Sequence, residues 1–129
     1  MIRAGVVGMG FIGQVHAKGY QATEGVQLTA VCDTDESKLK LAGEAAGDIA
    51  GLGKPLNLSG VQLYTDFDRM VSEAKLDAVS IALPTPMHAE FTIKALDAGL
   101  GVLCEKPMAQ NAGQCEEMIE AANRTDKIL

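Results

Sequence analysis

Long apolar runs are absent from this sequence of 129 residues, although 47% of its residues are apolar. A helix that spans a bilayer needs about 20 consecutive, mostly apolar residues, and no run here approaches that length. No basic segment leads into an apolar stretch, so we expect neither a membrane span nor a secretory signal. A charged fraction of 22% is ordinary for a soluble globular protein and argues against disorder.

Clusters of positive charge are also lacking. The formal net charge is −6, because 11 Lys and Arg residues stand against 17 Asp and Glu residues. A nucleic-acid-binding domain carries a basic patch that matches the phosphate backbone. The sequence therefore predicts no nucleic-acid partner.

Cysteines are few and show no pairing pattern. The three of them, Cys32, Cys104 and Cys115, form no CxxC pair and have no spacing typical of a metal site. Their odd number favours buried, reduced thiols in the cytoplasm over disulfides. We expect a cytoplasmic protein without a metal centre.

Present instead is a regular alternation of short β-rich runs and helical patterns. The predicted strands are residues 2–7, 26–32, 61–64, 76–83 and 101–104, and residues 127–129 would begin a sixth. The helix starts carry capping residues: Asp35, Asp66 and Asn111, with Thr85 and Pro86 as an N-cap and N1 pair for the helix that ends near Gly99. Residues 48–60, rich in glycine, read as a long loop.

This order of elements predicts the fold. Strands that alternate with helices form a parallel sheet with right-handed crossovers and helices on both faces. We therefore expect an α/β, doubly wound Rossmann fold in one three-layer domain over residues 1–129. The first helix places Ile12, Val15 and Gly19 on one face, and the last has Cys115, Met118, Ile119 and Ala122 at core spacing.

A glycine-rich turn, Gly-Met-Gly-Phe-Ile-Gly, follows the first predicted strand. Gly8 permits a tight turn, Gly10 lets the backbone approach a pyrophosphate, and Gly13 lets the helix pack closely on the sheet. The start of the helix that follows favours the charge of a diphosphate. A GxGxxG pattern alone is weak evidence, but here a strand precedes it and a helix follows. We predict a dinucleotide site.

An acidic residue at the end of the second strand sharpens this prediction. Asp33 lies 20 residues beyond Gly13, where a carboxylate accepts hydrogen bonds from the ribose of the adenosine half. Asp35 and Glu36 lie nearby without an arginine, so a 2′-phosphate would meet like charge. We therefore expect NAD rather than NADP, although Lys38, the only local cation, could soften the preference.

Three stretches taken together resemble the Gfo/Idh/MocA family of oxidoreductases. The glycine turn extends to GxGxxGxxH and ends on His16, Leu-Pro-Thr-Pro-Met-His occupies residues 83–88, and Cys-Glu-Lys-Pro-Met-Ala occupies residues 104–109. The Glu-Lys-Pro triplet is the most specific of these, and the resemblance extends over the whole chain. It implies an NAD-dependent dehydrogenase acting on a sugar, cyclitol or related polyol.

The resemblance also implies roles for single residues. Lys106 matches the lysine that lies beside the nicotinamide and the substrate and assists catalysis, where an ammonium group stabilises developing negative charge. The Lys106–Pro107 bond is often cis in the family. The other positions implied at the cofactor are Phe11, Ile12, Pro84, Thr85, His88 and Glu105.

Several of these positions have an alternative interpretation. His88 is equally well explained as a helix-start histidine bonded to a loop backbone group. His16 is better explained by a structural role. Glu105 either positions Lys106 or contacts the ribose, and the sequence does not decide between the two.

Family members continue into a larger α+β domain that supplies substrate-binding and further acid–base residues. This sequence has no counterpart of that domain. We therefore expect the chain by itself to hold the cofactor with little turnover, and expect homo-oligomers only where that domain is present.

Two other functions fit parts of the pattern. One is a non-catalytic NAD-binding regulatory module, which the presence of Lys106 disfavours. The other is a methyltransferase that binds S-adenosylmethionine, which the third glycine of the turn and the Glu-Lys-Pro triplet make improbable.

Overall fold

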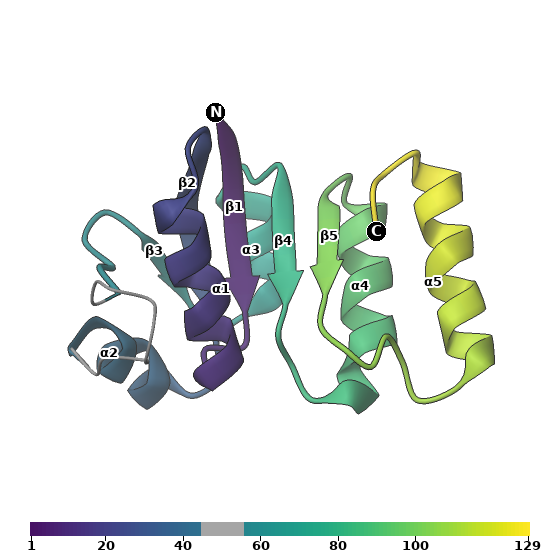
Figure 1. Cartoon of the computed structure of the whole chain (residues 1–129), viewed down its shortest axis with the longest axis horizontal. Coiled ribbons are helices and arrows are strands. Elements are labelled where there is room, and N and C mark those ends of the chain that lie inside the picture. Colours follow the sequence, from purple (N-terminus) through teal and green to yellow (C-terminus); the bar gives the residue numbers. More distant parts are fainter. Residues whose placement is uncertain (45–55) are drawn as a thin grey trace.

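A computed structural model describes residues 1–44 and 56–129 of the chain. In this part of the chain the strands form one parallel sheet of five, in the order β3-β2-β1-β4-β5 (Figure 1). The strands are β1 (Ile2–Val7), β2 (Val26–Cys32), β3 (Gln62–Tyr64), β4 (Ala78–Ile81) and β5 (Gly101–Cys104).

Helices cover both faces of this sheet. They are α1 (Phe11–Ala22), α2 (Glu36–Glu44), α3 (Phe67–Glu73), α4 (His88–Asp97) and α5 (Ala112–Thr125), with a short 3₁₀ turn, η1 (Thr85–Met87), before α4. Figure 1 shows α1 in front of the sheet and α3 and α4 behind it. One buried cluster contains Ala17 of α1, and a second contains Met70, Leu96 and Ala121 of α3, α4 and α5. The doubly wound Rossmann fold is confirmed.

The strand order positions the functional site. β1 lies between β2 and β4, so the chain crosses from one side of β1 to the other after β3. The connection after β1 enters α1 on one face, whereas the connection after β4 enters α4 on the other. A crevice opens at such a reversal of strand order, at the carboxyl ends of the strands.

Most predicted boundaries agree with the structure. β1, β2 and β5 have the predicted bounds, β3 begins one residue later than expected, and β4 is shorter than residues 76–83. β4 is short because its pairing with both neighbours covers only residues 78–81, although the apolar run continues on each side. The predicted loop over residues 48–60 falls mostly outside the described residues.

The helix caps were predicted well, with one exception. The side chains of Asp66 and Asn111 accept hydrogen bonds from Arg69 N (2.7 Å) and Gln114 N (2.9 Å) as N-caps. Asp35 accepts from Ser37 N (2.9 Å) at the start of α2. Thr85, however, is not an N-cap: Pro84 precedes η1, and α4 begins only at His88. Two prolines in this segment favour a tight, extended entry over a regular first helical turn.

Two predicted helix faces were wrong in part. α1 buries Gly13 and Ala17, whereas Ile12 is exposed at the mouth of the crevice. α5 buries Met118 and Ala121, whereas Ile119 is half exposed. α5 packs against α4 at the end of the layer (Figure 1), so only a narrow stripe of its surface is covered and the neighbouring apolar position remains in solvent.

The last residues run beside the sheet without forming a regular strand. Ile128 O accepts a hydrogen bond from Val102 N of β5 (2.8 Å), so the segment lies next to β5, where a sixth strand was expected. Among the residues that the structure describes, none of the helices has the length and apolar character needed to cross a membrane.

Candidate functional site

The carboxyl ends of β1, β2 and β4 surround a cavity of about 650 Å³. Six of the predicted cofactor-binding residues line it: Gly8, Gly10, Phe11, Ile12, Asp33 and Pro84. Five others lie outside its lining: Gly13, Thr85, His88, Glu105 and Lys106. The sequence therefore located the cavity from three segments that are far apart along the chain.

Two glycines of the turn are required by the packing of the protein itself. Gly8 has a φ of +88°, which side chains rarely adopt, and a Cβ atom there would overlap the carbonyl oxygen of Ala82. A Cβ atom at Gly13 would overlap the carbonyl oxygen of Gly8. These two residues let β1, β4 and α1 approach one another.

Gly10 differs from both. Its backbone is ordinary (φ −67°, ψ −168°), and a Cβ atom built there would have no heavy atom within 4 Å. Gly10 is also the N-cap of α1 and provides no side-chain cap, so the start of the helix faces the cavity with its backbone groups. Packing does not explain a glycine here, whereas a diphosphate held against the helix start does. The cavity fits a dinucleotide at this point.

Asp33 joins β2 to the glycine turn. Its carboxylate is 8% exposed and accepts hydrogen bonds from Met9 N (Oδ2, 2.8 Å) and Asp35 N (Oδ1, 2.9 Å). Lys38 Nζ lies 3.6 Å from Oδ2. Because each carboxylate oxygen accepts more than one hydrogen bond, Asp33 retains acceptor capacity for ribose hydroxyls. The same residue therefore shapes the turn and lines the cavity.

The electrostatic environment at the end of β2 is negative. Burial, together with the smaller effect of the charges of Asp33 and Asp66, raises the pKa of the Cys32 thiol to about 12. All three residues line the cavity, with Lys38 and Lys94 as the cations in its lining. Among the described residues, no group of three or more His, Cys, Asp and Glu side chains could hold a metal ion.

Part of the cavity wall was missed by the sequence analysis. Thr65 and Asp66 follow the carboxyl end of β3, and the rule that ligands bind at strand ends could have identified them. Phe67 and Phe91 form an edge-to-face pair with ring centroids 5.0 Å apart, and both line the cavity. No sequence signal relates these two rings, because they lie on different helices.

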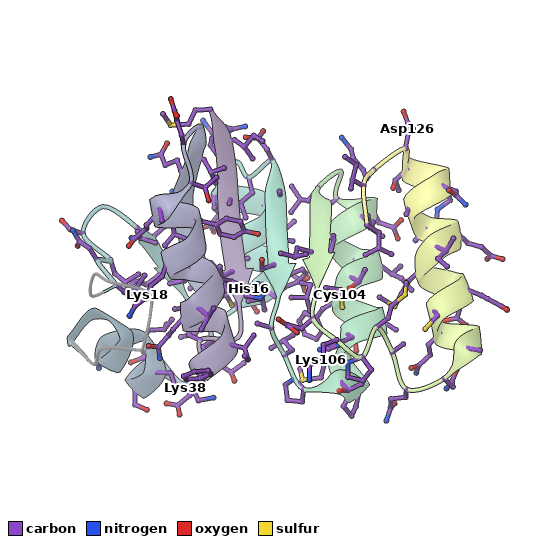
Figure 2. The ribbon with its side chains drawn as sticks, in the orientation of Figure 1. His16, Lys18, Lys38, Cys104, Lys106 and Asp126 are labelled. Atoms are coloured by element: carbon purple, nitrogen blue, oxygen red, sulfur yellow. The ribbon has the colours of Figure 1, made fainter. Side chains whose placement is uncertain are left out.

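Lys106 lies in the loop after β5, at the same edge of the molecule as the cavity (Figure 2). Its side chain is exposed, and its backbone N donates a hydrogen bond to Glu105 Oε2 (2.9 Å). The other carboxylate oxygen, Oε1, lies 2.8 Å from His16 Nε2. Two hydrogen bonds hold the pKa of Glu105 below its usual value: the one from Lys106 N has the larger effect, and the one from His16 the next largest. An ionised Glu105 thus connects α1 to the Lys106 loop.

His88 lies differently from the position expected of a cofactor ligand. Its side chain is 1% exposed, with Nδ1 2.8 Å from Pro107 O and Nε2 2.7 Å from Leu83 O. Both ring nitrogens are therefore occupied by loop backbone groups, as the alternative interpretation anticipated. The Lys106–Pro107 peptide bond is cis.

Comparison with known proteins agrees with this geometry. The model of an oxidoreductase family with an NAD-binding Rossmann fold matches residues 2–129. The chain is 32% identical to D-glucoside 3-dehydrogenase of Escherichia coli, over 99% of this chain and 33% of that protein. It is 33% identical to inositol 2-dehydrogenase 3 of Saccharopolyspora erythraea, over 99% of this chain and 34% of that protein.

Solved structures are similar over the same region. Scyllo-inositol dehydrogenase from Lactobacillus casei, with bound NAD(H) and scyllo-inositol, matches with a TM-score of 0.80 and 28% identity, over 99% of this chain and 34% of that one. The WlbA dehydrogenase from Bordetella pertussis, in complex with NADH and UDP-GlcNAcA, matches with a TM-score of 0.81 and 27% identity, over 98% and 35%. The chain spans about a third of the length of these relatives.

Proposed function

Because this chain belongs to the Gfo/Idh/MocA family of oxidoreductases and has its NAD-binding Rossmann fold, we propose that residues 1–129 are the cofactor domain of an NAD-dependent dehydrogenase. The substrate is a sugar, cyclitol or related polyol, as the relatives' names suggest. The observation that carries the proposal is the position of Lys106, at the carboxyl end of β5 and at the edge where the glycine turn forms its cavity.

The residues of the chain divide the binding of NAD between them. Gly10 and the start of α1 receive the diphosphate, and Asp33 accepts the ribose hydroxyls of the adenosine half. Phe11 and Ile12, exposed at the mouth of the cavity, cover the diphosphate, and Pro84 borders the nicotinamide half. Glu105 and His88 act through the Lys106 loop rather than on the dinucleotide.

Bound NAD supplies a hydride acceptor at the nicotinamide ring. The contribution of this chain to the chemistry comes from Lys106, whose ammonium group donates a hydrogen bond to the reacting oxygen of the substrate. That contact stabilises negative charge on this oxygen, both in the alkoxide from which the hydride leaves and, in the reverse direction, as the carbonyl is reduced. Lys106 is the only residue of this chain to which we assign a catalytic role.

We further propose that the site prefers NAD to NADP. The phosphate on a 2′-oxygen would approach Asp33, which is buried and already bonded to two backbone N–H groups. Asp66 and Asp68 add negative charge to the cavity lining, and Lys38 Nζ lies 3.6 Å from Asp33 Oδ2. Like charges at contact distance cost about 1 kcal/mol even in water.

We also propose that the protein is located in the cytoplasm. Cys32 is buried and Cys104 and Cys115 are half buried, and all three are free thiols. Thiols that remain reduced are typical of the cytoplasm.

Steady-state kinetics test the proposal. The protein as its gene encodes it should oxidise at least one member of a sugar and cyclitol panel with NAD. Lys106→Ala should lower kcat by about 100-fold or more and leave the Kd for NADH nearly unchanged, with Lys127→Ala, an exposed lysine near the end of the chain, as the matched control. The 129-residue chain should bind NADH with little turnover.

Three results would contradict parts of the proposal. Full activity of Lys106→Ala would remove its catalytic role, and tighter binding of NADP would reverse the cofactor preference. Binding of NADH by a protein that oxidises no member of the panel would favour a non-catalytic NAD-binding module.

A further inference from the structure

Two histidines hold the backbone on either side of Lys106. On the N-terminal side, His16 Nε2 lies 2.8 Å from Glu105 Oε1, and Glu105 Oε2 accepts from Lys106 N at 2.9 Å. An ionised carboxylate only accepts, so the ring donates from Nε2. If the carboxylate lost His16 it would be free to rotate away from the amide of Lys106.

On the C-terminal side, His88 connects the carbonyl of Pro107 to that of Leu83. Carbonyl oxygens only accept, so the ring donates to them. A neutral ring can donate one of these two bonds and a protonated ring both. To hold the Lys106 loop, the ring must carry a proton on Nδ1 and donate it to Pro107 O; a neutral ring of this form donates nothing to Leu83 O, whereas a protonated ring donates to both carbonyls. His88 makes these contacts from a site that is 1% exposed.

These contacts connect the three segments that form the cofactor site. His16 lies on α1, which begins at the glycine turn, and His88 lies at the start of α4, which follows Leu83 and Pro84. Glu105 lies 89 residues from His16, and Pro107 lies 19 residues from His88. The segments meet only through the tertiary fold, and their relative position determines where the ammonium of Lys106 lies.

We propose that His16 and His88 are positioning residues that hold Lys106 in register with the dinucleotide. The inference rests on the proposed function, in which Lys106 is catalytic. Misplacing a catalytic group by about 1 Å lowers the reaction rate about 100-fold. Fixing the Lys106 loop from both sides therefore has a direct effect on the rate. Neither histidine is assigned a contact with the substrate or the cofactor.

Pairs of amide variants separate positioning from a general structural role. Glutamine carries its donor where Nε2 of histidine lies, and asparagine carries its donor where Nδ1 lies. At position 16, where Nε2 makes the contact, His16→Gln should keep kcat within about threefold, whereas His16→Asn should lower it by about 10-fold to 100-fold. At position 88, His88→Asn should keep the bond to Pro107 O and most of kcat. His88→Gln should lose the bond to Pro107 O and, with it, much of kcat.

The KM for NAD should stay nearly constant in all four variants, because the interactions that hold the dinucleotide are unchanged. Two conservative changes serve as controls. Tyr20→Phe removes the 2.6 Å hydrogen bond between α1 and Ser80, away from Lys106, and Thr92→Val alters a buried side chain one turn beyond His88 on α4. Both should leave kcat unchanged.

Hydrogen exchange of the Lys106 amide in the 129-residue chain gives a second measurement that needs no turnover. The rate should rise by about tenfold in His16→Asn and in His88→Gln, as expected when local opening becomes easier, and remain near wild type in His16→Gln, His88→Asn and both controls. If position 88 does not tolerate the amides, the His16 pair decides the result by both measurements.

Equal kcat and equal exchange rates for the two amides at each position would overturn the proposal. The outcome is also separable from that of the proposed function. If the protein oxidises no polyol but the exchange rates follow the predicted order, the two histidines hold the loop and the dehydrogenase assignment fails. If Lys106→Ala is inactive and neither pair changes kcat, the dehydrogenase assignment stands and the positioning role fails.

Discussion

At the scale of single residues, the three glycines of the turn have different reasons to be glycine. Gly8 and Gly13 are required because a Cβ atom would overlap a neighbouring carbonyl group. Gly10 borders open space, so the folded protein alone does not need it. This difference separates what the fold requires from what the proposed binding of the diphosphate requires.

Alanine substitutions should therefore affect different quantities at the two positions: stability at Gly8 and NADH binding at Gly10. Gly8→Ala should lower the free energy of unfolding by at least about 2 kcal/mol, through the positive φ and the overlap with Ala82 O. Gly10→Ala should change it by less than about 1 kcal/mol but weaken NADH binding by about tenfold, or about 1.4 kcal/mol. Urea unfolding and fluorescence titration with NADH measure the two quantities. Unchanged NADH affinity in Gly10→Ala would mean that the diphosphate does not lie at the start of α1.

Asp33 should contribute to binding through its charge. Asp33→Asn keeps the size of the side chain but loses the carboxylate, and hydrogen bonds to a charged group are worth about 1.5–3 kcal/mol. NADH affinity should fall by about 10-fold to 100-fold, and the ratio of NADPH to NADH affinity should rise. Calorimetric titration with both cofactors checks this result.

Asp35→Asn is the matched control for Asp33→Asn, because Asp35 caps α2 and does not line the cavity. Its affinity for both cofactors should remain close to wild type. A similar loss in both variants would assign the effect to the net charge of the segment.

At the scale of elements, the helix ends follow local chemistry closely. α4 ends in a Schellman motif: Gly99, with a φ of +83°, donates to Leu96 O (2.8 Å), and Leu100 N donates to Ala95 O (3.0 Å). Asn111 caps α5 through Gln114 N. The start of α4 is the exception, since its first turn is displaced to His88 by the loop that borders the cavity.

Asn111→Ala should destabilise the chain by about 1 kcal/mol, because Gln114 N loses its capping acceptor at the start of α5. The free energy of unfolding in urea measures this loss. Glu117→Ala, on the exposed face of the same helix, should change stability by no more than about 0.5 kcal/mol. Equal effects of the two variants would contradict a specific role of the cap.

At the scale of the whole molecule, an ion pair joins β1 to the segment before β4 at the amino ends of the strands, remote from the cavity. The Arg3 guanidinium donates to both oxygens of Asp77 (3.0 and 2.8 Å), and Arg3 N donates to Oδ2 (2.8 Å). The hydrogen bonds from the guanidinium and from the backbone of Arg3 hold the pKa of Asp77 well below its usual range.

The stability of the chain should consequently depend on pH through Asp77. Since the folded-state pKa lies below the unfolded value of about 3.9, the contribution is complete above that value and is lost as the pH falls toward the folded pKa. Asp77→Asn should be less stable than wild type at pH 7, and the difference should shrink progressively below about pH 5. Urea unfolding between neutral and acidic pH measures it, and a difference that stays constant with pH would refute the assignment.

Much of this molecule could be predicted from local sequence. Some features are visible within a few neighbouring residues, because dihedral preference, capping and pleat alternation act at that range. These features are the apolar runs of β1, β2 and β5, the caps Asp66 and Asn111, and the glycine turn. Together with Asp33 they were enough to locate the cavity at the carboxyl ends of the strands. The alternation of strands and helices is also visible along the sequence, and it predicts the doubly wound sheet.

Tertiary structure decided what depends on contacts between distant segments. Whether Ile119 was buried depended on which surface of α5 meets α4, and the pairing of Phe67 with Phe91 depended on how two helices pack. The sequence left His88 between two roles and Glu105 between two partners. Only the fold brought His88 to the carbonyls of Leu83 and Pro107, and His16 to Glu105, because hydrogen bonds across 19 and 89 residues leave no local pattern.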